Sequence, residues 1–271
     1  MTLPRRALLA CIAALALPGV AAAEGFVVLG STTTTETSGL LAHLAPLFEA
    51  ETGIALRVVV AGTGKILRLA ENGDVDVALT HDPVGERAFV EANPGASRRD
   101  AMANDFLIAG PEEDPAKVAE AAGAADAFAR IAAASARFYS RGDDSGTHRR
   151  ERAIWASAGL SPKGDWYRET GAGMGATLNV AAASGGYLLV DRGTWASFGR
   201  RAGLEALVEG DPAFRNQYGV VLPPPDRPDP RRRAAAEAFA DWLTGPEGQA
   251  AIAAFEIDGA RIFAPNAAPR G

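Results

Sequence analysis

Four short segments of the sequence are rich in hydroxyl side chains and glycine, a composition suited to binding a small anion. They are residues 31–35, 62–64, 140–147 and 173–177. Each precedes a predicted helix, and the first turn of a helix exposes unpaired N–H groups that carry partial positive charge. Serine and threonine hydroxyls add donors, while glycine lets the backbone approach a ligand closely. The pattern predicts an anion site built at helix N-termini.

One arginine belongs to the third of these segments. Arg141 precedes Ser145 by four residues, so its planar guanidinium could point at an anion held at the helix start. Asp143 or Asp144 could orient Arg141, and Asp143 could instead accept the proton of a hydrogen phosphate ligand. Hydroxyl residues are also common helix caps, so each segment alone has a purely structural interpretation. Four successive threonines, at 32–35, favour binding because they place hydroxyls on both faces of the chain.

Two nucleotide-binding patterns are incomplete in this chain. Residues 171–176 match a dinucleotide fingerprint, and Asp191 follows 20 residues after its first glycine. The preceding residues 165–169 are too charged for the buried strand that this motif requires. Residues 64–65 do not belong to a phosphate-binding Walker loop, because the earlier glycine is missing. A dehydrogenase or nucleotide hydrolase is therefore disfavoured.

No catalytic or metal centre stands out either. Ser145 lies close to His148, but His148 follows a helix cap and is expected to face solvent, so no general base emerges. His43 and His81 are expected to be structural or surface residues. The lone Cys11 excludes a cysteine-rich zinc site and a disulfide framework. The sequence predicts no metal and no cofactor.

The elements that must position these residues alternate between strands and helices. Predicted strands lie at residues 26–29, 55–61, 75–79, 106–108, 137–140, 187–190 and 218–222. Predicted helices include one that starts at Ser38 and stops at Gly53, one at 145–160, one from Met174, and two at 231–244 and 247–255. This rhythm is typical of an α/β fold with a largely parallel sheet, in which ligands bind at the carboxyl ends of the strands.

Composition limits the class of protein. The 271 residues are 48% hydrophobic and 22% charged, which is typical of a globular chain with one or two cores. The formal net charge of −6 and a sequence pI near 5.2 argue against a nucleic-acid partner, which would need a basic surface. The same acidity opposes an anionic ligand at long range, so attraction must arise locally.

Residues 1–23 have the pattern of a signal peptide. Two arginines precede an apolar stretch, and Ala21 and Ala23 predict cleavage before Glu24. The apolar stretch is about half the ~20 residues that span a bilayer. Two alternatives stay open: a lipobox at residues 8–11, which would make Cys11 a lipidated N-terminus, and twin-arginine export. Cleavage removes two arginines and no acidic residue, which takes the net charge to −8. We expect an exported, periplasmic protein.

Residues 140–147 are similar to the anion-binding segment of periplasmic phosphate- and oxyanion-binding proteins. Together with six further segments, they make the chain resemble the Tup-type tungstate-binding proteins of bacterial ABC importers across nearly the whole mature length. These segments are 31–34, 75–83, 104–106, 171–177, 191–194 and 241–244.

The resemblance implies a two-lobed type II binding fold. Each lobe would be a mostly parallel sheet flanked by helices, with the ligand in the cleft between lobes that close about a hinge. The expected division is a first lobe at 24–110, a second lobe at 111–214, and a return to the first lobe at 215–271. The expected ligand-binding residues, with Asp143 as an orienting residue, are Ser31, Thr32, Thr33, Thr34, Thr63, Arg141, Ser145, Thr147, Gly175 and Thr177. The run 31–34 departs from the family's Thr-Thr-Thr-Ser but keeps a hydroxyl at each place.

The implied function is capture of tungstate, with molybdate as a second ligand, and delivery to a membrane permease driven by an ATPase. Both oxyanions carry no proton at neutral pH, so their site needs only donors and fixed positive charge. Hydrogen phosphate carries a proton that needs an acceptor, and a phosphate-binding protein of the same fold is the alternative. The chain is expected to be a monomer and not an enzyme.

Overall fold

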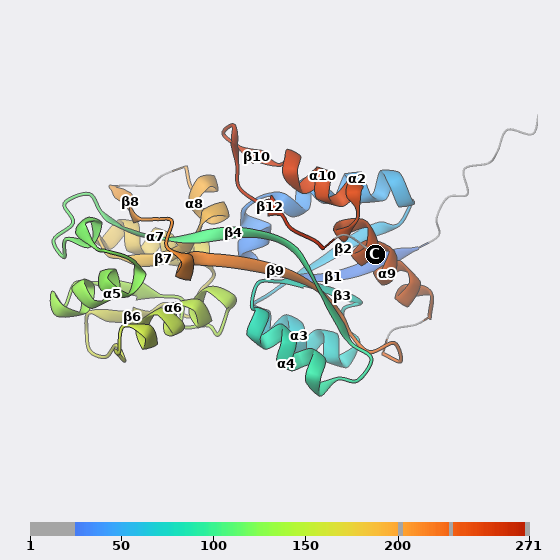
Figure 1. Ribbon diagram of the computed structural model, residues 1–271, viewed down its shortest axis with the longest axis horizontal. Helices are drawn as coiled ribbons and strands as arrows, with labels where there is room; N and C mark the ends of the chain where they lie inside the picture. Colours follow the sequence, from blue (N-terminus) through green and yellow to red (C-terminus); the bar gives the residue numbers. More distant parts are fainter. Residues whose placement is uncertain (1–24, 200–202, 228–229, 269–271) are drawn as a thin grey trace, which may run out of the picture.

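The computed structural model describes residues 25–199, 203–227 and 230–268, and shows two lobes joined by long strands (Figure 1). The predicted signal peptide and its cleavage site at Ala23/Glu24 lie outside the described residues. Within the described ranges, no helix is both long and apolar enough to cross a membrane.

The first lobe is built on a six-stranded sheet of order β12-β4-β9-β3-β1-β2. Its strands are β1 (Phe26–Ser31), β2 (Ala55–Val60), β3 (Val77–Thr80), β4 (Ser97–Pro111), β9 (Arg215–Leu222) and β12 (Ala264–Pro265). Its helices are α1 (Thr33–Thr37), α2 (Leu40–Thr52), α3 (Thr63–Asn72), α4 (Pro83–Ala92), α9 (Pro230–Thr244) and α10 (Pro246–Ala254). A small hairpin follows, made of β10 (Glu256–Ile257) and β11 (Ala260–Arg261). The core lies where α2, α9 and α10 pack on the sheet, around Phe48, Phe239 and Trp242.

The second lobe continues from the far end of β4. There β4 pairs with β7 (Leu188–Asp191) and β8 (Leu204–Val208), while β5 (Phe138–Ser140) pairs with β6 (Tyr167–Glu169). Its helices are α5 (Ala124–Ala133), α6 (Gly146–Ser157), α7 (Met174–Ser184) and α8 (Arg192–Ser197), with short 3₁₀ turns at Val118–Glu120 and Pro212–Phe214. Phe128, Phe138 and Trp155 form the aromatic centre of its core.

Strands β4 and β9 run side by side from one lobe to the other (Figure 1). They pair antiparallel from Ser97↔Leu222 to Asp105↔Arg215, after which β4 pairs with β7 and β8. The expected strand at 106–108 is therefore only one part of a 15-residue strand. Its first half is polar, and Arg98 there is satisfied by an ion pair with Glu86 instead of by apolar burial. Apolar patterning could not reveal it.

The expectation of mostly parallel sheets holds for only part of the fold. The pairs β1/β2, β1/β3 and β5/β6 are parallel, as predicted. The pairings of β4 with β7, β8, β9 and β12, and of β3 with β9, are antiparallel. The sheets are mixed because the two crossing strands run in opposite directions. The helix expected from Ser38 to Gly53 is α2, which begins at Leu40 after the N-cap Gly39, and the separate short helix α1 lies at Thr33–Thr37, where no helix was expected.

Candidate anion-binding site

Each of the four polar segments lies at the N-terminus of a helix, as the sequence predicts. The N-caps are Thr32 of α1, Gly62 of α3, Ser145 of α6 and Gly173 of α7. The two hydroxyl caps accept a hydrogen bond from the third N–H group of their helix, at 3.4 Å in α1 and 3.3 Å in α6. The four helices follow β1, β2, β5 and β6, so their N-termini stand at the carboxyl ends of strands.

These helix N-termini come together from both lobes. The Arg141 side chain of the second lobe donates from Nη2 to Oγ1 of Thr33 in the first lobe, at 3.2 Å. A Cβ atom built on Gly173 would lie 3.7 Å from the same Thr33 oxygen, and one built on Gly62 would lie 3.7 Å from the carbonyl oxygen of Asp143. These distances place the starts of α3 and α7 beside residues of the opposite lobe, at ordinary contact distance.

Arg141 is held rigidly at this junction. It is only 2% exposed, and its Nη2 donates to Oδ2 of Asp143 at 2.5 Å. The other carboxylate oxygen of Asp143 accepts the backbone N–H of Ser145 at 3.2 Å. Both oxygens of Asp143 thus contact the protein, which is the arrangement expected of an orienting residue.

Three buried polar atoms at this junction have no hydrogen-bond partner within the part of the chain that the structure describes. They are Nε of Arg141, Oγ1 of Thr63 and Oγ1 of Thr147. Thr63 and Thr147 are 0% and 1% exposed. Each buried donor left without a partner costs about 1–3 kcal/mol, so native structures rarely keep several in one place without a ligand to satisfy them. An acceptor-rich anion would satisfy all three.

In the run 31–34, three hydroxyls contact other groups of the first lobe, and the fourth, that of Thr33, has no acceptor for its proton among the described residues. The Ser31 hydroxyl donates to the carbonyl oxygen of Leu79 at 3.0 Å. Thr32 and Thr34 contact each other at 2.9 Å, and Thr34 contacts His81 at 3.0 Å. Oγ1 of Thr33 accepts from Arg141, so its own proton is available to a ligand.

The remaining predicted residues lie around the same junction. The Ser145 hydroxyl accepts a hydrogen bond in capping α6, which leaves its own proton available to a ligand. Thr177 is buried, and its hydroxyl contacts that of Thr170 at 2.8 Å. Gly175 lies in the first turn of α7, where a Cβ atom would meet nothing within 4 Å. Gly175 is therefore the member of the predicted set with the fewest contacts in this structure.

One histidine differs from its expected place, and a second lies buried beside the site. His148 was expected to face solvent but is buried, and its Nδ1 accepts the backbone N–H of Asp144 at 3.0 Å. Burial lowers its pKa. His81 is buried beside the run 31–34, and desolvation lowers its pKa to about 4. Sequence reasoning classed His81 as a structural or surface residue. The one local feature of the sequence that could have placed His81 near the site is its position directly after the carboxyl end of β3.

Sequence reasoning also missed Arg149, a second arginine that spans the lobes. It lies on α6 and donates to both oxygens of Asp144, at 3.0 and 2.7 Å. It also forms a short ion pair with Asp82, which follows β3 in the first lobe. This contact fixes the two lobes to each other beside the candidate site.

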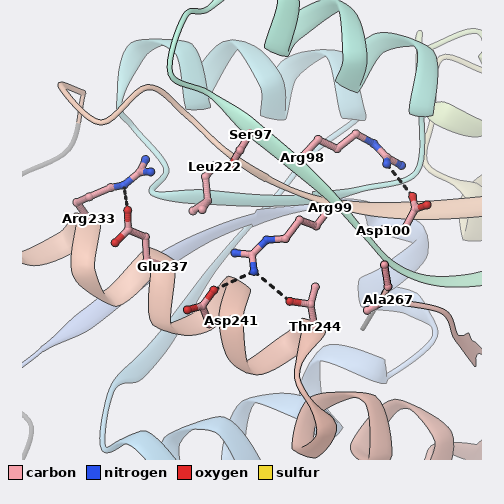
Figure 2. Close-up of a pocket in the computed structure, with 11 residues that line it drawn as sticks. Ser97, Arg98, Arg99, Asp100, Leu222, Arg233, Glu237, Asp241, Thr244 and Ala267 are labelled. Carbon is pink, nitrogen blue, oxygen red and sulfur yellow. Dashed lines mark hydrogen bonds and ion pairs between the residues drawn. The ribbon is translucent and has the colours of Figure 1, made fainter. Parts of the chain in front are cut away.

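A surface hollow beside β4 is a different kind of site. A cavity of about 760 Å³ lies between the start of β4 and α9 (Figure 2). Its arginines are paired with acids, as in the contact of Arg99 with Asp241 at 2.8 Å and that of Arg233 with Glu237 at 2.6 Å. Among the described residues, no cluster of three or more histidine, cysteine or acidic residues could hold a metal ion. The donor-rich junction of the lobes is therefore the candidate site.

Comparisons with known proteins identify the family to which the chain is similar. A family described as a PBP superfamily domain matches residues 19–247. The tungstate-binding protein TupA of Peptoclostridium acidaminophilum is 40% identical over 250 residues, which cover 91% of this chain and 87% of that protein.

Two solved structures are similar over both lobes. The tungstate-binding protein TupA from Desulfovibrio alaskensis G20 is 42% identical, with a TM-score of 0.74, and the match covers 90% of this chain and 100% of that one. The tungstate ABC transporter structure from Geobacter sulfurreducens is 41% identical, with a TM-score of 0.78, and the match covers 85% of this chain and 98% of that one.

Proposed function

The chain belongs to the PBP superfamily and, within it, to the family of TupA tungstate-binding proteins, and we propose that it captures tungstate between its two lobes. The family and the two-lobed fold predicted from the sequence motifs are thereby confirmed. The observation that carries the proposal is buried Arg141, whose unpartnered Nε lies at the junction where the hydroxyls of Thr63 and Thr147 are also unpartnered. Arg141, Thr63, Thr147 and the hydroxyl of Thr33 supply donors to the oxyanion.

The chemistry of the donor set favours an anion without a proton. Tungstate and molybdate are dianions at neutral pH, so each of their oxygens accepts hydrogen bonds. Hydrogen phosphate needs an acceptor for its proton, and Asp143 was the residue that sequence reasoning left open for this role. Both oxygens of Asp143 already contact Arg141 and Ser145, which supports tungstate over phosphate. Molybdate, of the same charge and shape, is the second ligand that we propose.

Delivery to a transporter completes the proposal. The named relatives are binding and transport proteins, in agreement with the expectation that this chain catalyses no reaction. We place it outside the cytoplasmic membrane, exported by the signal peptide at 1–23, as a monomer that docks on an ABC permease and its ATPase. No cofactor is needed, because binding and closure of the lobes suffice for capture.

Isothermal titration of the mature chain with tungstate, molybdate, sulfate and phosphate tests the proposal. We expect tight binding of tungstate, and loss of most of that affinity in Arg141→Ala. Arg141→Lys should also weaken binding, since an ammonium group lacks the planar fork. Arg152→Ala is the matched control, because Arg152 is an exposed arginine on α6. Tight phosphate binding with no response to tungstate would refute the proposal.

A further inference from the structure

A chain of hydrogen bonds leads from the first turn of α1 to the strands that join the lobes. Oγ1 of Thr32 contacts Oγ1 of Thr35 and Oγ1 of Thr34, each at 2.9 Å. Thr34 contacts Nε2 of His81 at 3.0 Å, and Nδ1 of His81 contacts Oδ1 of Asn216 at 3.0 Å. Residues 32, 34, 35, 81 and 216 are each at most 4% exposed, so water does not compete for these contacts.

The donor and the acceptor of each hydrogen bond in this series follow from one group that can only accept. Oδ1 of Asn216 can only accept, so Nδ1 of His81 carries the proton and Nε2 of the neutral ring accepts from Thr34. The single proton of Thr34 is then used, so Thr32 donates to Thr34. By the same reasoning, Thr35 donates to Thr32. A single imidazole tautomer therefore orients three hydroxyls beside the oxyanion site.

The far end of the chain is anchored on both crossing strands. Asn216 lies on β9 and donates from Nδ2 to Oδ1 of Asn104 at 2.7 Å, and these two residues are paired in the register of β4 with β9. The His81 ring stacks on Tyr218, also on β9, with ring centroids 5.1 Å apart. A Cβ atom on Gly146, at the start of α6, would lie 2.8 Å from the ring. His81 thus contacts the first lobe, the crossing strands and the second lobe.

We propose that His81 is a positioning residue for the oxyanion site, which fixes the hydroxyl orientations of α1 and couples them to β4 and β9. The proposal rests on the proposed function, because the helix start held by these contacts carries Thr33, whose hydroxyl belongs to the site assigned to tungstate. His81 does not contact the anion through its ring nitrogens, since both are engaged within the protein. Its contribution is that Thr32 and Thr34, whose protons are used within the protein, hold the intervening Thr33 in one arrangement, which reduces the entropy lost when the ligand binds. The lowered pKa keeps the ring neutral at neutral pH, as this arrangement requires.

The first test reads the tautomer directly. In the ¹⁵N-labelled mature chain without ligand, the two ring nitrogens of His81 should give the distinct shifts of a protonated Nδ1 and an unprotonated Nε2. A protonated Nε2, or rapid exchange between both forms, would overturn the proposal. This test does not depend on tungstate, so it separates failure of the positioning role from failure of the proposed function.

The second test measures tungstate affinity in two His81 variants. His81→Phe keeps an aromatic ring against Tyr218 but removes both nitrogens, and we expect affinity to fall about tenfold or more, the value of one lost hydrogen bond or two. His81→Gln supplies an acceptor to Thr34, so it should bind severalfold more tightly than His81→Phe. His43→Gln is the matched control, because His43 lies on α2 and contacts the carbonyl of Ala251.

Each result of the second test decides the proposal. Equal affinity of folded His81→Phe and the parent chain would overturn it, and so would equal losses in the Phe and Gln variants. If His81→Phe does not fold, Thr34→Val replaces it, since this isosteric change removes the donor to Nε2 without touching the ring. If the parent chain itself binds no tungstate, the proposed function fails, and the tautomer alone decides the role of His81.

Discussion

Replacing Glu151 by glutamine should make the protein more stable at alkaline pH and leave its stability at acidic pH nearly unchanged. Glu151 lies on α6 and is 2% exposed. Its Oε1 accepts from the Tyr167 hydroxyl at 2.8 Å and from the indole N–H of Trp155 at 3.2 Å. Burial is the largest cause that raises the pKa of Glu151 from 4.5 to about 7, against the hydrogen bonds that lower it.

The sign and size of the effect follow from proton linkage. Between pH 4.5 and 7 the folded chain holds a proton on Glu151 that the unfolded chain has lost, so the free energy of unfolding falls as pH rises through this window. A shift from 4.5 to about 7 corresponds to about 3 kcal/mol well above pH 7, at about 1.4 kcal/mol per pKa unit. Glutamine keeps an oxygen for Tyr167 and Trp155 but cannot ionise. Glutamine therefore removes the free-energy cost of holding an ionised carboxylate in the folded chain at alkaline pH.

Urea unfolding of the mature chain between pH 4 and pH 8.5 measures the difference. We expect Glu151→Gln and the parent chain to have similar stability near pH 4, with the variant gaining steadily up to about pH 8. Glu86, whose pKa burial also raises to about 7, and His81 titrate in both proteins, so their contributions cancel in the difference. Glu112→Gln, at an exposed site, is the matched control. Parallel stability curves for Glu151→Gln and the parent chain would refute the reasoning.

Two further predictions concern the junction of the lobes. Thr147→Val and Thr63→Val each remove a hydroxyl with no partner among the described residues. We expect tungstate affinity to fall about tenfold, while the free energy of unfolding stays level or rises by about 1 kcal/mol. Lost stability with unchanged affinity would show that the hydroxyls are structural. Arg149→Ala removes the ion pair with Asp82, so tungstate should dissociate severalfold faster in stopped-flow measurements, and an unchanged rate would contradict a role in holding the lobes closed.

The sequence predicted those parts of the site that depend on local geometry. Ser145 marks the start of α6 because the backbone N–H that its hydroxyl satisfies lies within one turn of the cap, and glycines precede the starts of α3 and α7. The short spacing between Arg141 and Asp143 likewise made their contact predictable. The start of α1 was missed, since threonine has low helix propensity and this helix is held by the Thr32 cap and by contacts between hydroxyls.

Contacts over long sequence distances were not predictable from the sequence. The contact of Thr34 with His81 joins residues 47 apart, and that of His81 with Asn216 joins residues 135 apart. No periodicity or spacing records such pairs, so His81 could only be classed by its type. The first half of β4 was missed for a related reason: its charged residues find partners on distant elements, Glu86 of α4 for Arg98 and Asp241 of α9 for Arg99.

The site also explains how an acidic protein can hold a dianion. Arg141 is paired with Asp143, so the two side chains together add little net charge. Attraction must then come from oriented dipoles: the N–H groups at helix starts, and hydroxyls whose protons have no other acceptor. Such dipoles are fixed by the fold and lose little energy through reorganisation when the ligand arrives. They also discriminate by protonation, because a site that only donates suits an anion that only accepts. The net negative charge therefore bears on the approach of tungstate from solution, whereas its retention depends on Arg141 and on the neutral donors between the lobes.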